Sequence, residues 1–542
     1  MTNGVRSSSR ALAAQGTTTI MKQSQRGLAN LAMFAAAKRL AQPQEPFASP
    51  AKIAIVDEAG VHSYADLLGD ARKVRAALGN KDHLGASIAM LMPSSYEYAA
   101  IQWGIWASGG AAVPLSPMHP ERELEYFISN SDSRYLICHP ALLPNVQPAL
   151  SRLDRPIQVL MSDSIMEMAQ VESADDMVID ENQGALFIYT SGTTGKPKGV
   201  VHTHASIAAQ VCALHKAWGW TVNDRLLHML PLHHIHGIVV ALCSALYSGA
   251  TTEMLPKFDR DRVWSRIIDG PQDISIIMGV PTMYSRLLQA LDAMPPERQL
   301  SASSAMGRLR LTVSGSAALP ASVFRQWQQA TGQVMLERYG MSEIGMALSN
   351  DAANPAERRA GSVGKPLPSV KVRLADTSNA DVTNVPEAMG MIQVRGPSVF
   401  REYYGLPDKT AKEFTSDGWF ITGDIGTRDA DGRYYIMGRE SVDIIKSGGY
   451  KLSALEIERE LLDHPNIADV AVIGIPSAEW GEEAAAAVVL RKGTALTISD
   501  LKPWCYARMA NYKTPRQLCA VEALPRNLMG KLDKKAVKAL FE

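Results

Sequence analysis

The segment YTSGTTGKPKGVVHTH, at residues 189–204, concentrates the groups that a polyphosphate needs around it. It offers hydroxyl groups, backbone N–H groups that no Cβ obstructs, and two ammonium groups. A Gly/Ser turn on the surface is the alternative, but such a turn does not require two threonines, two lysines and a proline in a fixed frame. The pattern therefore predicts a phosphate-binding loop made by Thr190, Ser191, Gly192, Thr193, Thr194, Gly195, Lys196 and Lys198.

The spacing excludes the P-loop of nucleotide triphosphatases, which has four residues between its first glycine and its Gly-Lys pair. Here only two threonines separate Gly192 from Gly195 and Lys196. Pro197 stands where a P-loop has the Ser or Thr that binds magnesium. This loop must therefore handle phosphate in another way.

Five later stretches complete a family pattern: SGSAALP (314–320), ERYGMSE (337–343), ITGD (421–424), GRESVDIIKSGGYKLSALEIE (438–458) and PRNLMGKLDK (525–534). Together with residues 189–204 they resemble the adenylate-forming superfamily, which holds acyl-CoA synthetases, luciferases and peptide-synthetase adenylation domains. The resemblance covers nearly the whole chain after the first 44 residues. It implies a large N-terminal domain followed by a small mobile C-terminal domain.

The resemblance also implies a nucleotide site assembled from several loops. Asp424, in a Thr-Gly-Asp turn, would accept hydrogen bonds from the ribose hydroxyls, with Arg439 beside it. Glu343 and Thr194 would bind Mg²⁺, because a hard cation takes oxygen ligands beside the phosphates, and Ser342 would support the phosphates. Ordinary turn chemistry is the alternative for these loop residues. The remaining nucleotide contacts would come from Gly315, Ser316, Ala317, Glu337, Tyr339, Gly340 and Met341.

Two stretches near the C-terminus supply the other half of the expected chemistry. Lys531 offers a point charge that can bridge a carboxylate and the α-phosphate of ATP, as its family counterpart does; the alternative is one surface lysine in a Lys-rich end. Rotation about Glu440 and Ser441 would then remove Lys531 and bring the KSGGYK stretch to coenzyme A. Ser441 departs from the Asp or Lys common in the family, although a serine can absorb a dihedral change. The expected coenzyme A contacts are Lys446, Ser447, Gly448, Gly449 and Tyr450.

The histidines of PLHHIHG invite a zinc interpretation that their spacing disfavours. His233, His234 and His236 are too close in sequence to reach one tetrahedral ion together, and no cysteine or acid with ligand spacing lies nearby. The segment resembles the family motif whose aromatic or His side chain borders the acyl pocket, and His234 is the matching position. An imidazole beside two anions is a useful hydrogen-bond donor.

Two arginines point to the acid that is activated. Arg286 follows the VPT strand end, in a region that forms part of the acyl pocket in this family, and Arg338 stands where many relatives have a small residue. An extra arginine implies an extra anion. With His236 and the stretch GPSVFREYY (396–404), the pattern most closely resembles malonyl-CoA synthetases of the organellar type. The alternatives are an outward-facing helix residue for Arg286 and an internal ion pair with Glu337 or Glu343 for Arg338.

The elements that must position these residues follow an α/β pattern. From Lys52 to Pro140 a hairpin and helix are followed by SIAMLMP, YEYAAIQWGIWASG, AAVPLSP, ERELEYFISNS and SRYLICHP, which alternate strand and helix. The apolar segments ALCSALYSGA, ISIIMGVP and LRLTVSGS, each followed by a helical pattern, continue this series. Short strands follow residue 370, and an α+β module of about 100 residues closes the chain. We expect βαβα subdomains plus a small β-rich subdomain over residues 45–439, and a mobile C-terminal domain over residues 440–542.

Residues 1–44 have a different composition. They contain no Asp or Glu but several Lys and Arg among Ser, Thr and Ala, which is typical of a transit peptide. We expect delivery to the mitochondrial matrix, with plastid or cytosol as alternatives. A basic tail followed by the domain's own first helix is the other interpretation of this region.

The overall composition limits the partners. Fifty-five basic and 55 acidic residues among 542 give a net charge of zero, which predicts no nucleic-acid partner. No apolar stretch reaches the roughly 20 residues of a membrane span, and five scattered cysteines suggest neither a disulfide framework nor a zinc knuckle. We expect a monomer or homodimer acting on small molecules.

These observations predict an AMP-forming acyl-CoA synthetase. The expected reaction joins malonate to coenzyme A through a malonyl-adenylate, with ATP and Mg²⁺, and releases AMP and pyrophosphate. A methylmalonyl-CoA or short- to medium-chain fatty acyl-CoA synthetase is the enzymatic alternative. A catalytically inactive binding homologue is the alternative from another functional class.

Overall fold

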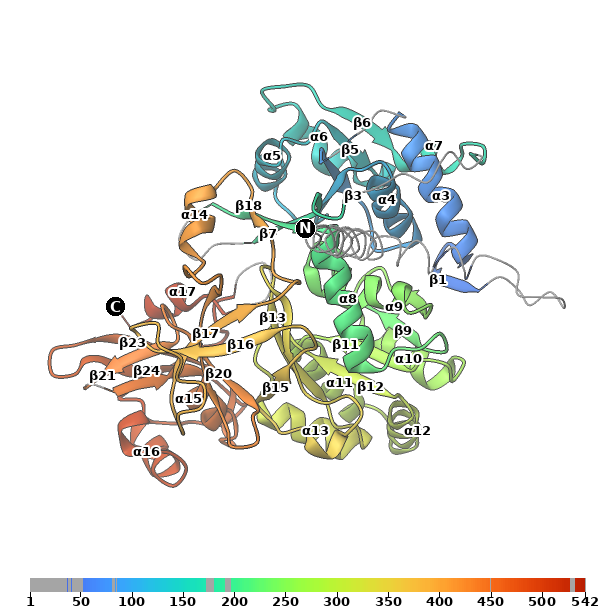
Figure 1. The fold of residues 1–542 in the computed structure, drawn as a ribbon. Helices are drawn as coiled ribbons and strands as arrows, with labels where there is room; N and C mark the ends of the chain where they lie inside the picture. Colours follow the sequence, from blue (N-terminus) through green and yellow to red (C-terminus); the bar gives the residue numbers. More distant parts are fainter. Residues whose placement is uncertain are drawn as a thin grey trace, which may run out of the picture.

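The computed structural model describes Ala37, Leu40 and residues 52–79, 83, 85–171, 180–190, 196–448, 450–526 and 532–541. Ser191, Gly192, Thr193, Thr194, Gly195, Gly449 and Lys531, all expected site residues, lie outside this part. The described chain is a mixed α/β structure built on three sheets (Figure 1), which confirms the expected fold class.

The largest sheet runs through the centre of the large domain. Its order is β16 (Lys371–Ala375), β17 (Gly390–Arg395), β19 (Phe420–Arg428), β20 (Tyr434–Arg439), β15 (Ser362–Pro366), β14 (Gly345–Ser349), β13 (Leu336–Met341), β12 (Leu311–Ser314), β11 (Ile276–Gly279), β9 (Arg225–His228), β10 (Thr251–Met254), β1 (Ile53–Asp57) and β2 (Gly60–Ser63). The strands from β13 through β12, β11, β9 and β10 to β1 pair in parallel. The short strands after residue 370 therefore extend this sheet rather than form an isolated unit.

The second sheet contains the predicted alternation at the start of the domain. Its order is β18 (Glu402–Tyr403), β8 (Lys198–Thr203), β7 (Gly184–Thr190), β4 (Ala111–Leu115), β3 (Ser87–Leu91), β5 (Tyr135–Cys138) and β6 (Gln158–Met161). Helices α3 (Tyr64–Ala77), α4 (Tyr96–Ala107), α5 (Glu121–Asn130), α6 (Leu143–Leu150) and α7 (Ser162–Met166) connect or follow these strands. The strands and helices expected between residues 53 and 138 are confirmed.

Helices also fill the connections of the large sheet. They are α8 (His204–Trp218), the π-helix η2 (His236–Cys243), α9 (Ser244–Tyr247), α10 (Arg260–Asp269), α11 (Pro281–Asp292), α12 (Pro296–Gly307), α13 (Ala321–Thr331) and α14 (Pro407–Lys412). The segment ALCSALYSGA was expected to repeat the strand-then-helix order, and that expectation is wrong. It is helical, through η2 and α9, and the strand β10 follows it. Its residues from 241 to 246 are all buried, so the apolar run reflects a helix surrounded on every side.

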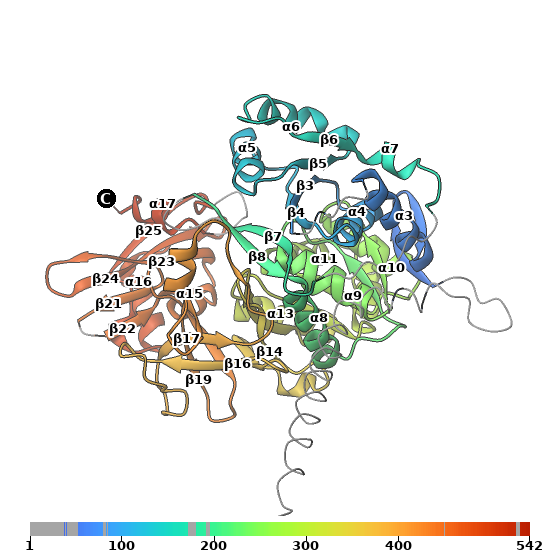
Figure 2. The same ribbon diagram turned by 45° about the horizontal axis from the view of Figure 1, so that its top comes forward.

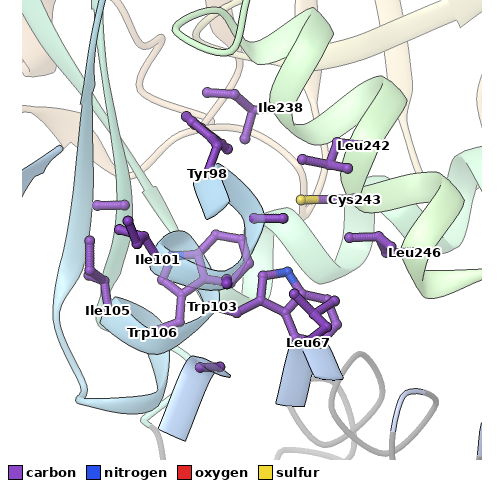
Figure 3. Close-up of a cluster of buried hydrophobic side chains, with 14 of the residues drawn as sticks. Leu67, Tyr98, Ile101, Trp103, Ile105, Trp106, Ile238, Leu242, Cys243 and Leu246 are labelled. Carbon is purple, nitrogen blue, oxygen red and sulfur yellow. The ribbon is translucent and has the colours of Figure 1, made fainter. Parts of the chain in front are cut away.

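The buried helix η2 joins the two halves of the large domain. Ile238, Leu242 and Cys243 belong to the same apolar cluster as the α4 side chains Tyr98 and Ile101 (Figure 3). Burial of such side chains contributes roughly 1.5–3 kcal/mol each. The position of His236, the first residue of η2, is thus fixed by a core that both sheets share.

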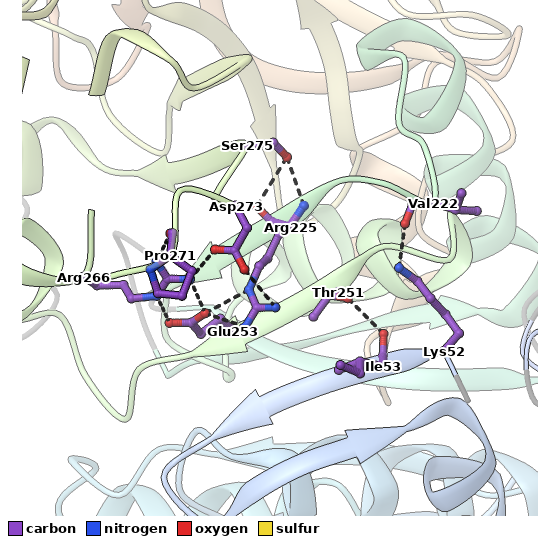
Figure 4. Close-up of polar contacts among 10 residues, drawn as sticks. All are labelled: Lys52, Ile53, Val222, Arg225, Thr251, Glu253, Arg266, Pro271, Asp273 and Ser275. Carbon is purple, nitrogen blue, oxygen red and sulfur yellow. Dashed lines mark hydrogen bonds and ion pairs between the residues drawn. The ribbon is translucent and has the colours of Figure 1, made fainter. Parts of the chain in front are cut away.

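The amino-terminal ends of the parallel strands carry a polar network (Figure 4). Arg225, which begins β9, forms an ion pair with Glu253 of β10 at 2.8 Å. It forms a second ion pair with Asp273 at 3.4 Å. The Thr251 hydroxyl donates to Ile53 O of β1 at 3.0 Å. These contacts align the strands at the end opposite to the loops considered below.

The third sheet begins at Ile444. It consists of β22 (Tyr450–Ser453), β21 (Ile444–Ser447), β24 (Gly481–Leu490) and β23 (Ile467–Ser477), with β25 (Gln517–Ala520) beside β24. Helices α15 (Ala454–Leu462), α16 (Ile498–Tyr506) and α17 (Lys534–Lys538) accompany it. Figure 2 shows this small domain beside the strands β17 and β19 of the large one.

Two described residues precede Lys52. Ala37 is fully buried within the apolar cluster that contains α4 and η2, and Leu40 packs against this cluster beside Gly249. Both residues therefore contact the folded domain. In the part of the chain that the structure describes, no helix is both long and apolar enough to cross a membrane.

Candidate active site

The predicted phosphate loop connects two antiparallel strands. Thr190, at the end of β7, pairs with Lys198, at the start of β8. The Lys198 Nζ lies 4.1 Å from the centre of the Tyr403 ring, and Lys196 Nζ lies 5.5 Å from that of Tyr126. Burial lowers the pKa of Lys198. Both ammonium groups are thus held by aromatic faces, which orient a cation without neutralising it.

Glu343 lies next to this hairpin, in the turn between β13 and β14. Its Oε1 accepts a hydrogen bond from the Tyr403 hydroxyl at 2.8 Å, and Tyr403 is the same ring that supports Lys198. The carboxylate is buried, and burial raises its pKa. Tyr403 was not assigned a role from the sequence, although it belongs to the stretch GPSVFREYY that was singled out.

The donor set around Glu343 fits a magnesium ion that arrives with a nucleotide. Mg²⁺ commonly takes one or two protein carboxylates and completes its shell with phosphates and water. Over the described ranges no group of three or more His, Cys, Asp or Glu could hold a metal by itself. A single carboxylate beside the predicted phosphate loop fits a Mg²⁺ ion that binds together with the nucleotide phosphates. It does not fit an ion that protein ligands alone coordinate.

Asp424 forms the second cluster, on β19. Its Oδ2 accepts from the Tyr339 hydroxyl at 2.6 Å, and its Oδ1 lies 2.9 Å from Nε of Arg439 on the paired strand β20. Arg439 also donates to Thr422 O at 3.0 Å. The structure therefore brings together Tyr339, Asp424 and Arg439, three of the expected nucleotide contacts.

The loop after β12 lies at the carboxyl end of the parallel strands, where α/β sheets bind ligands. Ser316 has a φ of +68°, an uncommon conformation for a residue with a Cβ, and such strain clusters at functional sites. Ser316 and Ala317 are exposed there. Gly340 allows a close approach, because a Cβ at this position would lie 2.0 Å from Gly345 O.

Three other expected nucleotide contacts have different surroundings. Met341 and Ser342 are half-buried, and Ser342 O accepts from His202 at 2.6 Å. Glu337 is buried and accepts from the Gly361 N–H at 2.8 Å. Burial raises the pKa of Glu337 to about 8. The Glu337 carboxylate thus supports the loop before β15.

Beneath the loop after β12 lies a buried cation. Arg338 is 4% exposed, and a Cβ on Gly315 would lie 2.2 Å from its Cζ. Its Nε and Nη2 have no hydrogen-bond partner among the described residues. Burial lowers the pKa of Arg338 to about 9, so the guanidinium is still charged at pH 7. The internal ion pair with Glu337 or Glu343 considered from the sequence is not among the ion pairs of the described residues.

His236 accompanies this arginine. It is 4% exposed, its Nδ1 lies 3.1 Å from the Ser316 hydroxyl, and its Nε2 has no partner in the described part of the chain. Burial, with Arg338 nearby, lowers the pKa of His236 far below its usual value, so the ring is neutral. A buried cation and a neutral imidazole with free polar atoms form a site that can receive an anion.

The other two expected substrate residues differ from this pair. Arg286 lies on the exposed side of α11. His234 is half-buried and its ring contacts His233 at a centroid distance of 4.1 Å, while His233 contacts His119 at 5.5 Å. Burial lowers the pKa of His233 to about 2 and that of His119 to about 4. His119 was not identified from the sequence, because no motif marks it.

The expected coenzyme A contacts occupy the turn of the hairpin β21–β22, at the outer edge of the small domain (Figures 1 and 2). Gly448 has a φ of +55°, and a Cβ there would lie 2.7 Å from the Trp480 ring. Tyr450 is exposed and stacks on Tyr512 at 4.5 Å. Lys446 is exposed and Ser447 is buried.

Comparison with known proteins gives a consistent result. Residues 44–404 match the family described as AMP-binding enzyme, and residues 456–531 match the AMP-binding enzyme C-terminal domain. The chain is 44% identical over 516 residues to the mitochondrial malonate–CoA ligase ACSF3 of Mus musculus, covering 89% of this chain and 88% of that protein.

Two solved structures add a comparison of shape. ATP-bound MatB from Rhodopseudomonas palustris is 32% identical, with a TM-score of 0.82 over 93% of this chain and 98% of that one. A malonyl-CoA ligase complex with methylmalonyl-CoA and AMP is 35% identical, with a TM-score of 0.64 over 90% of this chain and 99% of that one. Family matches that span both domains, together with a relative this similar over most of both chains, show that the chain belongs to the AMP-binding enzyme family.

Proposed function

We propose that this protein ligates malonate to coenzyme A through a malonyl-adenylate. The observation that carries the proposal is the buried Arg338, whose Nε and Nη2 lack partners within the described structure. A buried charge without a counterion is costly, and an anionic ligand group would offset that cost. A dicarboxylate keeps one carboxylate free for such a contact while the other reacts. Relatives named malonate–CoA ligases support the same substrate.

In the first half-reaction a carboxylate oxygen attacks the α-phosphorus of ATP and pyrophosphate leaves. Asp424 would hold the ribose hydroxyls with Arg439 beside it, and Lys196 and Lys198 would face the phosphates. Glu343, with Thr194, would hold Mg²⁺, which offsets the negative charge of the phosphates. Lys531 would bridge the attacking carboxylate and the α-phosphate.

In the second half-reaction the thiol of coenzyme A attacks the acyl carbon and AMP leaves. We propose a domain boundary near Glu440. Rotation of the small domain at this boundary would move Lys531 out of the active site and bring residues 446–450 into it. The higher TM-score against the ATP-bound relative than against the complex with methylmalonyl-CoA supports the view that the present arrangement is the adenylating one.

Two further points belong to this proposal. The methylmalonyl-CoA in one related complex makes methylmalonate the second candidate substrate. The acid-free composition of residues 1–44 and the mitochondrial relatives support delivery to mitochondria.

A substrate panel tests the function. Purified protein is given ATP, Mg²⁺ and coenzyme A with acetate, malonate, methylmalonate, succinate or octanoate, and thioester formation is measured. We expect malonate to give the highest kcat/KM and octanoate to be poor. Preferred use of octanoate would contradict the dicarboxylate proposal.

A further inference from the structure

The small domain contains a buried ion cluster that neither half-reaction above employs. Lys534, the first residue of α17, donates through Nζ to Val472 O at 2.6 Å and to the Glu458 carboxylate. The same Nζ lies 3.3 Å from Asp443 Oδ1. None of the three charged side chains is more than 13% exposed. Desolvating three charges is expensive where apolar side chains could pack instead, so their location needs a reason.

Asp443 links this cluster to the proposed hinge. Its Oδ2 accepts the backbone N–H of Arg439 at 2.9 Å, and its own N–H donates to Arg439 O at 2.8 Å. Glu440 and Ser441 lie between these two residues. In a hinge motion a few residues between the two moving parts, here Glu440 and Ser441, change their backbone dihedrals. The bonds between Arg439 and Asp443 therefore belong to one domain arrangement and must rearrange when the domain rotates.

Arg439 extends the link to the nucleotide site. Its Nε lies 2.9 Å from Oδ1 of Asp424, the proposed ribose ligand. A continuous series of polar contacts thus runs from Asp424 through Arg439 and Asp443 to Lys534. It crosses from the large domain into the small one.

Lys534 links the cluster to the base of the segment that carries Lys531. Arg526 and Leu532 form an antiparallel bridge, and the Asp533 N–H donates to Pro525 O at 3.0 Å. The five residues 527–531, which lie outside the described structure, begin and end at this base. Because Lys534 follows the base by two residues, its anchorage fixes where that segment leaves the domain.

We propose that Asp443 and Lys534 act as a latch that holds the base of the Lys531 segment against the hinge in the adenylating arrangement. Both are positioning residues for the first half-reaction, since they act through Lys531 and the hinge. This inference rests on the proposed two-step function. It assigns the latch no part in thioester formation, when the bonds across the hinge have rearranged.

The test measures the two half-reactions separately in the full-length protein. The first is pyrophosphate release from ATP with malonate and without coenzyme A; the second is thioester formation from supplied malonyl-adenylate and coenzyme A. Asp443→Asn is the main variant, because asparagine keeps the shape and can still accept the Arg439 N–H while the Lys534–Glu458 pair remains. Lys534→Met removes the cation and Lys534→Arg retains it. Lys513→Gln is the control, since it breaks another ion pair of α15, with Glu456 at 2.5 Å.

We expect Asp443→Asn to slow pyrophosphate release about 10-fold and Lys534→Met about 100-fold, the scale on which small misplacements of reacting groups act. Thioester formation from the adenylate should stay within about twofold of the parent protein in both, and Lys534→Arg should recover most of the first half-reaction. If Lys534→Met does not fold, Asp443→Asn decides. An equal loss in both half-reactions, or an unchanged first half-reaction in Asp443→Asn, overturns the latch. A parent protein that releases no pyrophosphate with malonate overturns the proposed function instead.

Discussion

Replacing Arg338 by methionine should lower malonate use without lowering stability. Methionine is similar in length to the arginine stem and can fill the same buried space. In the parent protein, burial lowers the pKa of this guanidinium from its usual value to about 9. Such a shift corresponds to a cost of about 5 kcal/mol for burying the charged form. The variant removes that cost, so its unfolding free energy should equal or exceed that of the parent protein.

Malonate activation should respond in the opposite direction. Breaking a buried charge pair costs about 3–5 kcal/mol, which corresponds to a loss of about 150- to 5000-fold in kcat/KM. Butyrate has no second carboxylate, so its use should change little or improve. The opposite signs of the stability and activity changes distinguish a ligand-binding cation from a structural one.

The assay compares kcat/KM for malonate and butyrate and the melting temperature without ligands in the parent protein, Arg338→Met and Arg286→Met. Arg286→Met is the matched control, because it removes the same charge from the exposed side of α11. Parallel losses with both acids, together with a lower melting temperature, would refute the reasoning. If only Arg286→Met selectively lowered kcat/KM for malonate, Arg286 rather than Arg338 would be the residue that binds the second, non-reacting carboxylate.

Four other predictions concern the substrate pocket, the pH dependence of stability, the catalytic lysine and the N-terminal segment. Gly315→Ala places a Cβ 2.2 Å from Cζ of Arg338, so it should displace the guanidinium and reduce the ratio of malonate to butyrate activity; an unchanged ratio in thioester assays would contradict the geometry. Burial raises the pKa of Glu337 to about 8, so the folded state holds this proton more tightly than the unfolded state. The contribution of this proton to the free energy of unfolding is therefore full below about pH 4.5 and is lost as the pH rises through 8. The unfolding free energy of Glu337→Gln, measured with urea at pH 5, 7 and 9, should therefore improve relative to the parent protein as the pH rises, and a constant difference would remove this explanation. Lys531→Ala should lose pyrophosphate release but still convert supplied malonyl-adenylate to the thioester, whereas equal losses would argue against domain alternation. Deleting residues 1 to about 25 should leave activity intact, and fusing them to a fluorescent reporter should direct it to mitochondria; a cytosolic reporter would contradict the targeting proposal.

The behaviour of α11 illustrates how far a local pattern can lead. Tyr284, Leu287, Leu288 and Leu291 are buried and follow the i, i+3, i+4, i+7 spacing of one helix face. That spacing already places Arg286 on the opposite face, so its exposure was available from the sequence. The family resemblance had instead predicted that Arg286 lies in the acyl pocket. The helical spacing and the resemblance thus give different predictions for this arginine.

The segment ALCSALYSGA shows the limit of such patterns. A short apolar run has no polar face, so periodicity cannot distinguish a buried strand from a buried helix. Its helical state depends on contacts with α4, which lies more than 100 residues earlier in the chain. The burial of Arg338 has the same origin, because strand β13 carries it between β12 and β14 under the loop at Gly315.

The sequence by itself determined the family, the α/β alternation, the phosphate loop and the chemical types at the nucleotide site, because these depend on neighbouring residues and their spacing. The tertiary structure alone decided which arginine is buried beside His236, that Tyr403 joins Lys198 to Glu343, and that Lys534 meets Asp443 across 91 positions of the chain. The physical reason is that burial, ion pairing and the resulting pKa shifts depend on which distant segments share one low-dielectric space, and no local spacing encodes that meeting.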